Sequence, residues 1–208
     1  YTAGVRDKVV DQLVSRYLDR LCRASFIADT YASIPGKGLH KAVKAARYFC
    51  KLASLGGHKQ CFVLKCDIRS YFASIDHGIL LDSLKDKVLD EHIFKLISLL
   101  ITSFNNESGR GLPLGNVSSQ ILANIYLHKF DIWVKKEMRE RYYVRYNDDF
   151  IVISETRERL IKIVGAMRLC LARELKLSLP ANKTSISKLN SGFDFLGSKK
   201  FKSGNPDC

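Results

Sequence analysis

The feature that most constrains the fold is a pair of β-rich runs, Tyr142–Tyr146 and Phe150–Ile153, with only Asn147, Asp148 and Asp149 between them. Two such runs around a short polar centre predict a β-hairpin, because Asn and Asp tolerate the backbone geometry of a tight turn. The two strands of a hairpin run antiparallel. We therefore expect an antiparallel sheet that carries two carboxylates at one of its turns.

A third β-rich run, Phe62–Ile68, has the composition of a buried strand and places Asp67 near its end. Further short strands are expected near Ser185–Ile186 and Phe193–Leu196. If these strands join one sheet, Asp67 can reach the same rim as the two aspartates of the hairpin. The sequence thus predicts three carboxylates at one end of the sheet.

The segments between these runs carry apolar residues at helical spacing. Asp76 fits the N-cap of one helix, while Ser118 and Ser119 are candidate caps of another. The first helix is expected to be amphipathic, with Val9 and Leu13 among its apolar residues. Its polar residues Arg16, Asp19 and Arg20 are expected to point outward. The predicted helices cover about Asp7 to Cys22, Leu39 to Leu52, the stretch from Ile79 to Val88, Ile93 to Phe104, Ser118 to Met138 and Arg157 to Leu175. Strands separated by helices in this order indicate the α+β class, with a small and largely antiparallel sheet backed by helices.

The charge balance points to a polyanionic partner. The 208 residues include 34 Lys and Arg against 21 Asp and Glu, a formal net charge of +13. An excess of this size in a folded chain favours nucleic acid or an acidic membrane face, and does not choose between them. A hydrophobic content of 46% excludes disordered and fibrous classes.

The cysteines and the hydropathy pattern indicate a cytoplasmic protein. The six cysteines form no Cys-x-x-Cys pair, which favours reduced thiols over a zinc site. No apolar run is long enough to span a membrane, so we expect no membrane partner. The chain begins at Tyr1 rather than Met, which suggests a fragment of a longer protein.

The three aspartates favour a particular kind of chemistry. Neighbouring carboxylates repel one another and raise each other's pKa unless a cation lies between them. Oxygen ligands without nearby His or Cys favour Mg²⁺, and two such ions about 4 Å apart serve nucleotidyl transfer. The alternative is simple turn chemistry, in which a solvated Asp-Asp pair only stabilises the hairpin turn.

Seven segments resemble the successive motifs of a known family, the reverse transcriptases. The likeness covers nearly the whole chain, and the segments follow in the order of the family. Those that resemble the palm motifs are Phe62–Phe72, Gly111–Leu127, Tyr143–Ile151, Leu177–Thr184 and Phe193–Gly197, and those that resemble the fingers motifs of the bacterial enzymes are Arg6–Val10 and Ser33–His40.

The resemblance implies a right-hand polymerase palm with partial helical fingers. It divides the chain into partial fingers over residues 1–60 and a palm over residues 61–200, with fingers helices at about 77–110. Residues 201–208 would lead toward a thumb that the chain does not contain. Because the upstream fingers hairpin and the thumb are not present in full, we expect the fragment alone to polymerise poorly.

The resemblance also implies roles at the three aspartates. Asp67 and Asp148 would be the principal ligands of two Mg²⁺ ions, for which Mn²⁺ is a possible substitute, and Asp149 would be a weaker third ligand. Lys183 would donate a proton to the leaving pyrophosphate. The alternative for Lys183 is an ordinary surface lysine.

The incoming nucleotide would meet a second group of residues. Phe72 would lie under its sugar and exclude a ribose 2′-hydroxyl by steric clash, which favours deoxyribonucleotides; its alternative is a core aromatic. The backbone amides of Ser70 and Tyr71 would face the triphosphate. Leu114 and Gly115 would lie beneath the nucleotide and the template base, where glycine permits close backbone approach.

Basic residues in the Ser33–His40 segment and in the helix that follows it would contact nucleic acid. Lys37, Lys41, Lys44 and Arg47 would follow the template phosphates, and Tyr146 would also contact nucleic acid. Such contacts supply affinity rather than sequence choice. The alternative is a solvated helix face.

The partners that follow are an RNA template, a DNA or RNA primer and deoxynucleoside triphosphates, with a possible accessory protein. Leu-Gly-Asn-Val-Ser-Ser-Gln at 114–120 is most similar to the enzymes of diversity-generating retroelements, because group II intron enzymes usually carry Gln at position 114. Three alternatives stay open: a group II intron enzyme, an RNA-dependent RNA polymerase, against which Phe72 argues, and a non-catalytic RNA-binding splicing helper.

Overall fold

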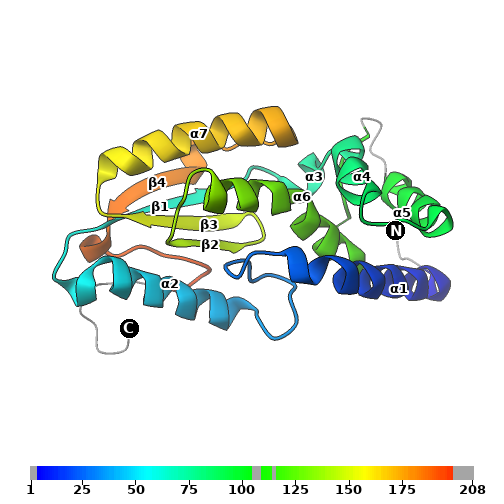
Figure 1. The fold of residues 1–208 in the computed structure, drawn as a ribbon, viewed down its shortest axis with the longest axis horizontal. Coiled ribbons are helices and arrows are strands. Elements are labelled where there is room, and N and C mark those ends of the chain that lie inside the picture. The colour runs from blue at the N-terminus through cyan, green and yellow to red at the C-terminus, as the bar shows by residue number, and fades with distance from the viewer. Residues whose placement is uncertain (1–3, 105–108, 114–115, 199–208) are drawn as a thin grey trace.

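The computed structural model describes residues 4–104, 109–113 and 116–198 (Figure 1). Helices pack around one antiparallel sheet, which is the arrangement of the α+β class. The helices are α1 (Val5–Cys22), α2 (Leu39–Ala53), α3 (Tyr71–Ser74), α4 (His77–Lys85), α5 (Glu91–Ser103), α6 (Val117–Lys136) and α7 (Arg157–Leu175). The strands are β1 (Phe62–Asp67), β2 (Tyr143–Tyr146), β3 (Asp149–Ser154) and β4 (Thr184–Lys188).

The four strands form one antiparallel sheet in the order β2-β3-β1-β4. The hairpin of β2 and β3 lies at one edge, and β1 pairs with both β3 and β4. In the register, Asp67 is opposite Asp149 at one end of the β1–β3 pair, and Phe62 is opposite Ser154 at the other. The end of the sheet that carries the aspartates is therefore set by backbone pairing.

The two faces of the sheet pack against different helices. Figure 1 shows α6 and α7 on one side of the strands and α2 on the other. Leu64 and Val152 belong to the larger buried cluster, which includes α6 and α7, whereas Val63 and Ile151 belong to a smaller cluster with α2. Because side chains alternate along a strand, each strand contributes to both clusters.

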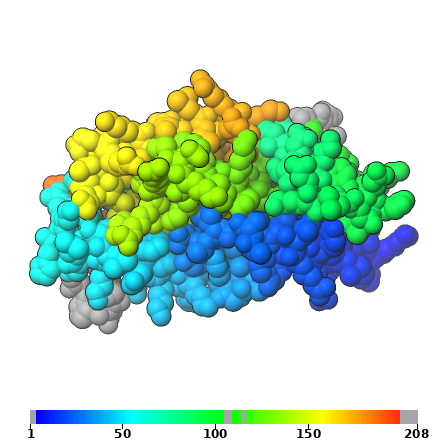
Figure 2. All heavy atoms as spheres, in the orientation of Figure 1, coloured from blue at the N-terminus to red at the C-terminus, as the bar shows by residue number. Residues whose placement is uncertain are grey.

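Helix α6 lies at the centre of the molecule and contacts α1, α4 and α7. The apolar residues of α6 are spread around the helix rather than confined to one face, because most of the helix is surrounded by protein. In the space-filling view, α1 and α2 form one long side of the molecule, and α7 lies on the opposite side (Figure 2). The buried residues of α6 are Ser118, Ser119, Ile121, Leu122, Ala123, Asn124, Ile125, Tyr126, Leu127, Phe130, Asp131 and Val134.

Most of the predicted elements are confirmed. Helix α7 has the bounds expected from its periodicity, and the hairpin, β1 and β4 lie where the β-rich runs placed them. Asp76 is the N-cap of α4, where its side chain accepts a hydrogen bond from the Ile79 N–H at 3.2 Å. The described cysteines are free thiols. No described helix is long and apolar enough to cross a membrane.

The orientation expected for α1 was wrong in part. Val9 and Leu13 are 54% and 60% exposed, while Asp11 and Ser15 are buried on the inner face. The reason is that Asp11 caps the neighbouring helix. Its Oδ2 accepts the Val117 N–H at 3.0 Å and the Ser118 N–H at 3.4 Å.

The same contact corrects the prediction for the start of α6. The N-cap is Asn116, whose side chain makes no capping bond, and Ser118 and Ser119 are buried inside the helix. The Ser118 hydroxyl donates to Asp11 Oδ1. The free N–H groups of a helix terminus can be satisfied by any acceptor nearby, and here a carboxylate from α1 replaces the local cap.

The strand expected at Phe193–Leu196 is absent from the described part of the chain. Phe195 forms only an isolated bridge with Ser198. The backbone turns here because Gly192, Leu196 and Gly197 have φ values of 77°, 53° and 75°. Phe193 and Phe195 instead bury their rings in the cluster around α2.

The interhelix cap supplies a stability prediction. Replacement of Asp11 by Ala leaves the first N–H groups of α6 without an acceptor and should lower the free energy of unfolding by about 1–2 kcal/mol. Asp7→Ala on the same helix is the control. Asp7 accepts the exposed Gly4 N–H at the start of α1, so its loss should change stability by less than about 0.5 kcal/mol. Urea denaturation measures both, and equal effects would contradict the assignment.

Candidate active site

The strand register brings the predicted acidic residues to one end of the sheet. Tyr146 on β2, Asp149 on β3 and Asp67 on β1 are successive cross-strand neighbours. Residues opposite each other in antiparallel strands point to the same face, with Cβ atoms about 4.5–5.5 Å apart. Asp148 occupies the adjoining turn, where its carbonyl accepts the Ile68 N–H at 3.3 Å. Three carboxyl-bearing residues from two distant segments are therefore neighbours.

Burial and mutual repulsion raise the pKa values of the two hairpin carboxyls. Partial burial raises the pKa of Asp148, and the nearby charge of Asp67 raises it further. Burial, followed by the charges of Asp148 and Asp67, raises the pKa of Asp149 to about 6. When both carboxyls are ionised, the nearby positive charges offset their repulsion only in part. A cation between the carboxylates would relieve that repulsion.

Lys183 contributes positive charge at this end of the sheet. It lies in the short turn that precedes β4, and its Nζ donates to Asp67 Oδ1 at 2.7 Å. The hydrogen bond to Asp67 raises the pKa of Lys183, with smaller contributions from Asp148 and Asp149. The lysine is thus a neighbour of all three carboxyl groups.

The donor set suits a hard divalent cation. It consists of carboxylate oxygens, and Lys183 already shows that Asp67 binds positive charge there. Within residues 4–104, 109–113 and 116–198, no three His, Cys, Asp or Glu side chains are gathered into a metal-binding group as they stand. Cation binding would therefore require Asp67 to exchange Lys183 for the ion and the carboxylates to turn toward it.

The segment after β1 carries the residues predicted to meet a nucleotide. Ser70 has φ 47°, a left-handed conformation that directs the chain into α3. Tyr71 is buried, and its hydroxyl donates to the Ala123 carbonyl of α6. Phe72 is partly exposed and packs edge-on against the Tyr71 ring, with ring centroids 5.5 Å apart. The Phe72 ring thus packs against a residue that is anchored in the core.

The segment that leads to Leu114 and Gly115 is tied to the same region. The Gly111 N–H donates to the Ile75 carbonyl at 2.8 Å, and the Leu112 N–H to the Phe72 carbonyl at 2.8 Å. The ring of buried His77 hydrogen-bonds the Gly111 carbonyl through Nε2 at 2.7 Å. Leu114 and Gly115 themselves lie outside the described residues.

The predicted nucleic-acid residues divide into two groups. Lys37 donates to the carbonyls of Ala28 and Thr30 at 2.6 and 2.8 Å and lies 5.1 Å from the centroid of the Tyr31 ring. Burial lowers the pKa of Lys37. The structure thus gives this lysine a role in shaping its own loop.

The basic residues of α2 lie on its outer side. Lys41 and Lys44 are exposed and Arg47 is half-buried. Residues on this side of α2 line a surface groove of about 600 Å³ together with Ser198. Its members from α2 are His40, Val43, Lys44, Arg47, Tyr48 and Lys51. A groove with several cations and an exposed aromatic ring suits a phosphate backbone and its bases.

Sequence reasoning missed the buried Arg145, which precedes the acidic turn. Its side chain is completely buried and forms a two-point ion pair with Asp131 of α6, at 2.8 and 2.6 Å. It also donates to the carbonyl of Asn147 at 3.0 Å. The available signals were an arginine inside an otherwise apolar strand and an aspartate inside an apolar helix, since buried charges are nearly always paired.

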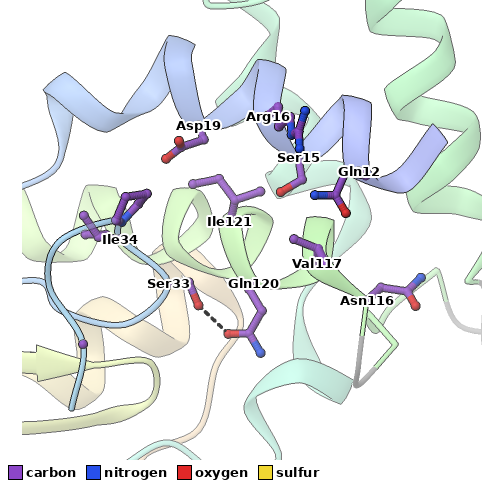
Figure 3. Close-up of a pocket in the computed structure, with 12 residues that line it drawn as sticks. Gln12, Ser15, Arg16, Asp19, Ser33, Ile34, Asn116, Val117, Gln120 and Ile121 are labelled. Carbon is purple, nitrogen blue, oxygen red and sulfur yellow. Dashed lines mark hydrogen bonds between the residues drawn. The ribbon is translucent and has the colours of Figure 1, made fainter. Parts of the chain in front are cut away.

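A cavity beside the start of α6 was also missed. It has a volume of about 570 Å³, the size of a small-molecule site, and lies between α1, the 33–38 loop and α6 (Figure 3). The Ser33 hydroxyl bridges two of these walls by donating to Gln120 Oε1 at 2.7 Å. The walls come from three separate segments, so no single motif reveals the cavity.

Comparison with known families identifies the class of the protein. A model described as "Reverse transcriptase (RNA-dependent DNA polymerase)" matches residues 3–199. Because the match extends over nearly the whole chain, the protein belongs to the reverse transcriptase family.

Particular relatives are found among curated proteins. Protein YkfC of Escherichia coli K12 is 25% identical over 93% of this chain, and the chain covers 60% of that protein. The group II intron-encoded protein LtrA of Lactococcus lactis subsp. cremoris is 26% identical over 76% of this chain and 28% of its own length. The chain thus spans less than two thirds of the length of these relatives.

Solved structures share the fold. Telomerase from Candida albicans, in a complex with a fragment of telomeric RNA, superimposes with a TM-score of 0.70 at 12% identity, over 94% of this chain and 38% of that one. Apo telomerase from Candida tropicalis truncated from its C-terminal domain gives a TM-score of 0.66 at 15% identity, over 94% of this chain and 44% of that one. The expected architecture, helices around a small antiparallel sheet in a palm-and-fingers arrangement, is confirmed.

The raised pKa of Asp149 predicts a pH dependence of stability. Its value is about 6 in the folded protein against an ordinary 3.8. The folded state therefore binds this proton more tightly than the unfolded state, and the stability it contributes is lost as the pH rises between these two values. In the absence of divalent cations, Asp149→Asn should raise the melting temperature at pH 7 by about 2–4 °C, since the carboxyl is only partly buried.

Thermal denaturation in EDTA at pH 4 and pH 7 measures this effect. Asp82→Asn, at an exposed position on α4, is the matched control and should leave the melting temperature unchanged at both pH values. A variant at Asp149 that melts with the same pH dependence as the natural protein would rule out the proposed repulsion.

Proposed function

We propose that the chain is the catalytic part of an RNA-directed DNA polymerase that extends a primer 3′-hydroxyl with deoxynucleotides. The observation that carries this proposal is the gathering of Asp67, Asp148 and Asp149 at one end of the sheet, with Lys183 bound to the first of them. An RNA-binding protein without enzymatic activity has no use for clustered carboxylates beside phosphate. Family membership supports the same activity.

The carboxylates would hold the cations of the reaction. Asp67 and Asp148 would be the principal ligands of two Mg²⁺ ions or of Mn²⁺, with Asp149 as a weaker third. When bound, such ions lower the pKa of an attacking hydroxyl and stabilise a leaving phosphate oxygen. Lys183, displaced from Asp67, would keep a proton on Nζ within reach of the leaving pyrophosphate. A lysine ammonium keeps its proton at neutral pH even without the hydrogen bond to Asp67.

The nucleotide would lie over the segment after β1. The Phe72 ring would occupy the space that a ribose 2′-hydroxyl needs. Its packing on the buried Tyr71 would keep the ring from moving aside. The backbone N–H groups of Ser70 and Tyr71 would face the triphosphate. Leu114 and Gly115 would support the nucleotide and the template base.

Template and primer would run across the surfaces that carry positive charge. Lys41, Lys44 and Arg47 of α2 would contact phosphates, and Tyr146 would contact the primer end beside Asp149. Lys37 would act on the template through the loop that it shapes. The division into partial fingers (1–60), palm (61–200, with fingers helices at about 77–110) and a tail (201–208) is part of this proposal.

The finer proposal concerns the element that the enzyme serves. The segment at 114–120 supports a diversity-generating retroelement, because it carries Leu where the intron enzymes usually carry Gln. The similarity to LtrA supports the alternative, a group II intron enzyme. An accessory protein and a cytoplasmic location also remain predictions.

Removal of one metal ligand tests the activity. In primer extension on an RNA template by the natural full-length protein, Asp148→Ala should reduce DNA synthesis by at least about a thousandfold, the scale found when one member of a catalytic group is removed. Asp82→Ala on the surface of α4 should retain full activity. Undiminished synthesis by the Asp148 variant would exclude the metal assignment.

Replacement of the aromatic ring tests sugar selection. Phe72→Ala opens the space beneath the sugar, so the preference for deoxyribonucleotides should fall by about one to two orders of magnitude. Competitive incorporation of a ribonucleotide and the matching deoxyribonucleotide measures the preference. Phe72→Tyr, which keeps the ring, serves as the control. An unchanged preference in the alanine variant would remove Phe72 from this role.

A further inference from the structure

The buried Arg145 guanidinium uses all five of its N–H groups. Nε and Nη2 donate to the two carboxylate oxygens of Asp131, and Nη2 also approaches the Thr30 hydroxyl at 3.5 Å. Nη1 donates to Asn124 Oδ1 at 3.1 Å and to the Asn147 carbonyl at 3.0 Å. Five donors in a rigid plane match five acceptor contacts, so the orientation of the group is fixed.

One of these contacts reaches the acidic turn itself. The Asn147 carbonyl belongs to the peptide group that joins Asn147 to Asp148, so the hydrogen bond from Nη1 orients this peptide plane. Asn147 has φ 52°, a left-handed conformation that asparagine adopts more readily than most residues. The bond from Arg145 holds the carbonyl of this turn residue at 3.0 Å from Nη1.

Helix α6 fixes the guanidinium from the other side. Asn124 and Asp131 lie on α6, and Asn124 Nδ2 donates in turn to the Ala32 carbonyl at 2.7 Å. The acidic turn is thus connected through Arg145 to the central helix of the protein. The backbone of Arg145 adds two bonds to the same region, from its N–H to the Asp29 carbonyl and from the Tyr31 N–H to its own carbonyl.

We infer that Arg145 is a positioning residue for the cation site of the hairpin turn. It orients the peptide that carries Asp148 and thereby sets the direction from which this carboxylate meets a divalent cation. The inference rests on the proposed function, because it requires Asp148 to be a cation ligand. Groups that orient metal ligands typically contribute ten- to a hundredfold to metal affinity.

A lysine could not replace this arginine. Lysine keeps the positive charge opposite Asp131 but offers three donors from a single nitrogen, so it cannot bond Asp131 on one side and the Asn147 carbonyl on the other. Arg145→Lys therefore separates the charge of the residue from its geometry.

A purely structural role for Arg145 makes a different prediction. In that case its contacts would matter only for folding, and any variant of the network that loses stability would behave alike. Thr30 distinguishes the two cases. Its hydroxyl donates to Asp131 Oδ2 at 3.0 Å and accepts the long contact from Arg145 Nη2 at 3.5 Å, whereas the bond to the turn comes from Nη1. Thr30→Val thus weakens the same buried network without altering the bond to Asn147.

The experiment measures Mn²⁺ affinity by electron paramagnetic resonance in the natural full-length protein without nucleic acid, together with the melting temperature. Arg145→Lys should bind Mn²⁺ at least tenfold more weakly, within the range found for groups that orient metal ligands. Thr30→Val should melt at a lower temperature but bind Mn²⁺ as the natural protein does. Asn124→Ala removes the acceptor that shares Nη1 with the turn and leaves the ion pair in place. It should weaken binding several-fold, and it decides the question if Arg145→Lys does not fold.

Each outcome separates this inference from the proposed function. If Asp148→Ala binds Mn²⁺ as tightly as the natural protein, the cation site itself is refuted. If Asp148→Ala loses binding while the folded Arg145 and Asn124 variants keep it, the site stands and the positioning role is overturned. A loss of affinity in Thr30→Val equal to that in Arg145→Lys would likewise assign Arg145 to general stability.

Discussion

The buried ion pair between Arg145 and Asp131 is the interaction on which the rest of the structure depends. Both side chains are completely buried. An isolated buried pair gains little, because the loss of hydration offsets the attraction, and removal of one partner typically costs about 3–5 kcal/mol. Here the remaining donors and acceptors are satisfied as well, since Asp131 also accepts bonds from Thr30 and Tyr143. The pair therefore acts as a specific connection between β2, α6 and the segment around residue 30.

Two groups of acidic residues in this strongly basic protein differ in how their negative charge is compensated. The charge of Asp131 is balanced by Arg145, and the hydroxyl groups of Tyr143 and Thr30 donate further hydrogen bonds to it. Asp148 and Asp149 are partly buried beside each other and beside Asp67, and Lys183 donates its hydrogen bond to Asp67. The fold thus completes the hydrogen bonding of the acid that it uses for structure. It leaves the acids of the turn with unfavourable repulsion, which is the condition that favours cation binding.

Local chemistry predicted the parts of the fold that depend on neighbouring residues. The periodicity of α7 and the Asn-Asp-Asp turn lie within short segments, so one sequence was sufficient to place them. The inner face of α1 could not be predicted in this way, because Asp11 is buried to cap a helix more than a hundred residues away. The bonds of Arg145 connect it to α6, to the segment around residue 30 and to the adjoining turn, and the sequence alone contains only the hint of a charge in an apolar strand. Candidate ligands were predicted from their chemistry, whereas the buried arginine that bonds the acidic turn was not.

Side chains alternate along β2, so this strand contacts both the buried ion pair and the candidate site. Tyr143 and Arg145 face α6, where they bond Asp131, while Val144 and Tyr146 face the side of α2. Arg145 and Tyr146 are consecutive, so a shift that alters the hydrogen bonds of one also moves the other, which is opposite Asp149. The backbone of Arg145 is also bonded to the segment that leads into the 33–38 loop and the cavity of Figure 3. Because Arg145 bonds both the Asn147 carbonyl of the acidic turn and the backbone of Asp29 and Tyr31, the same buried residue connects that turn to the segment that leads into the cavity.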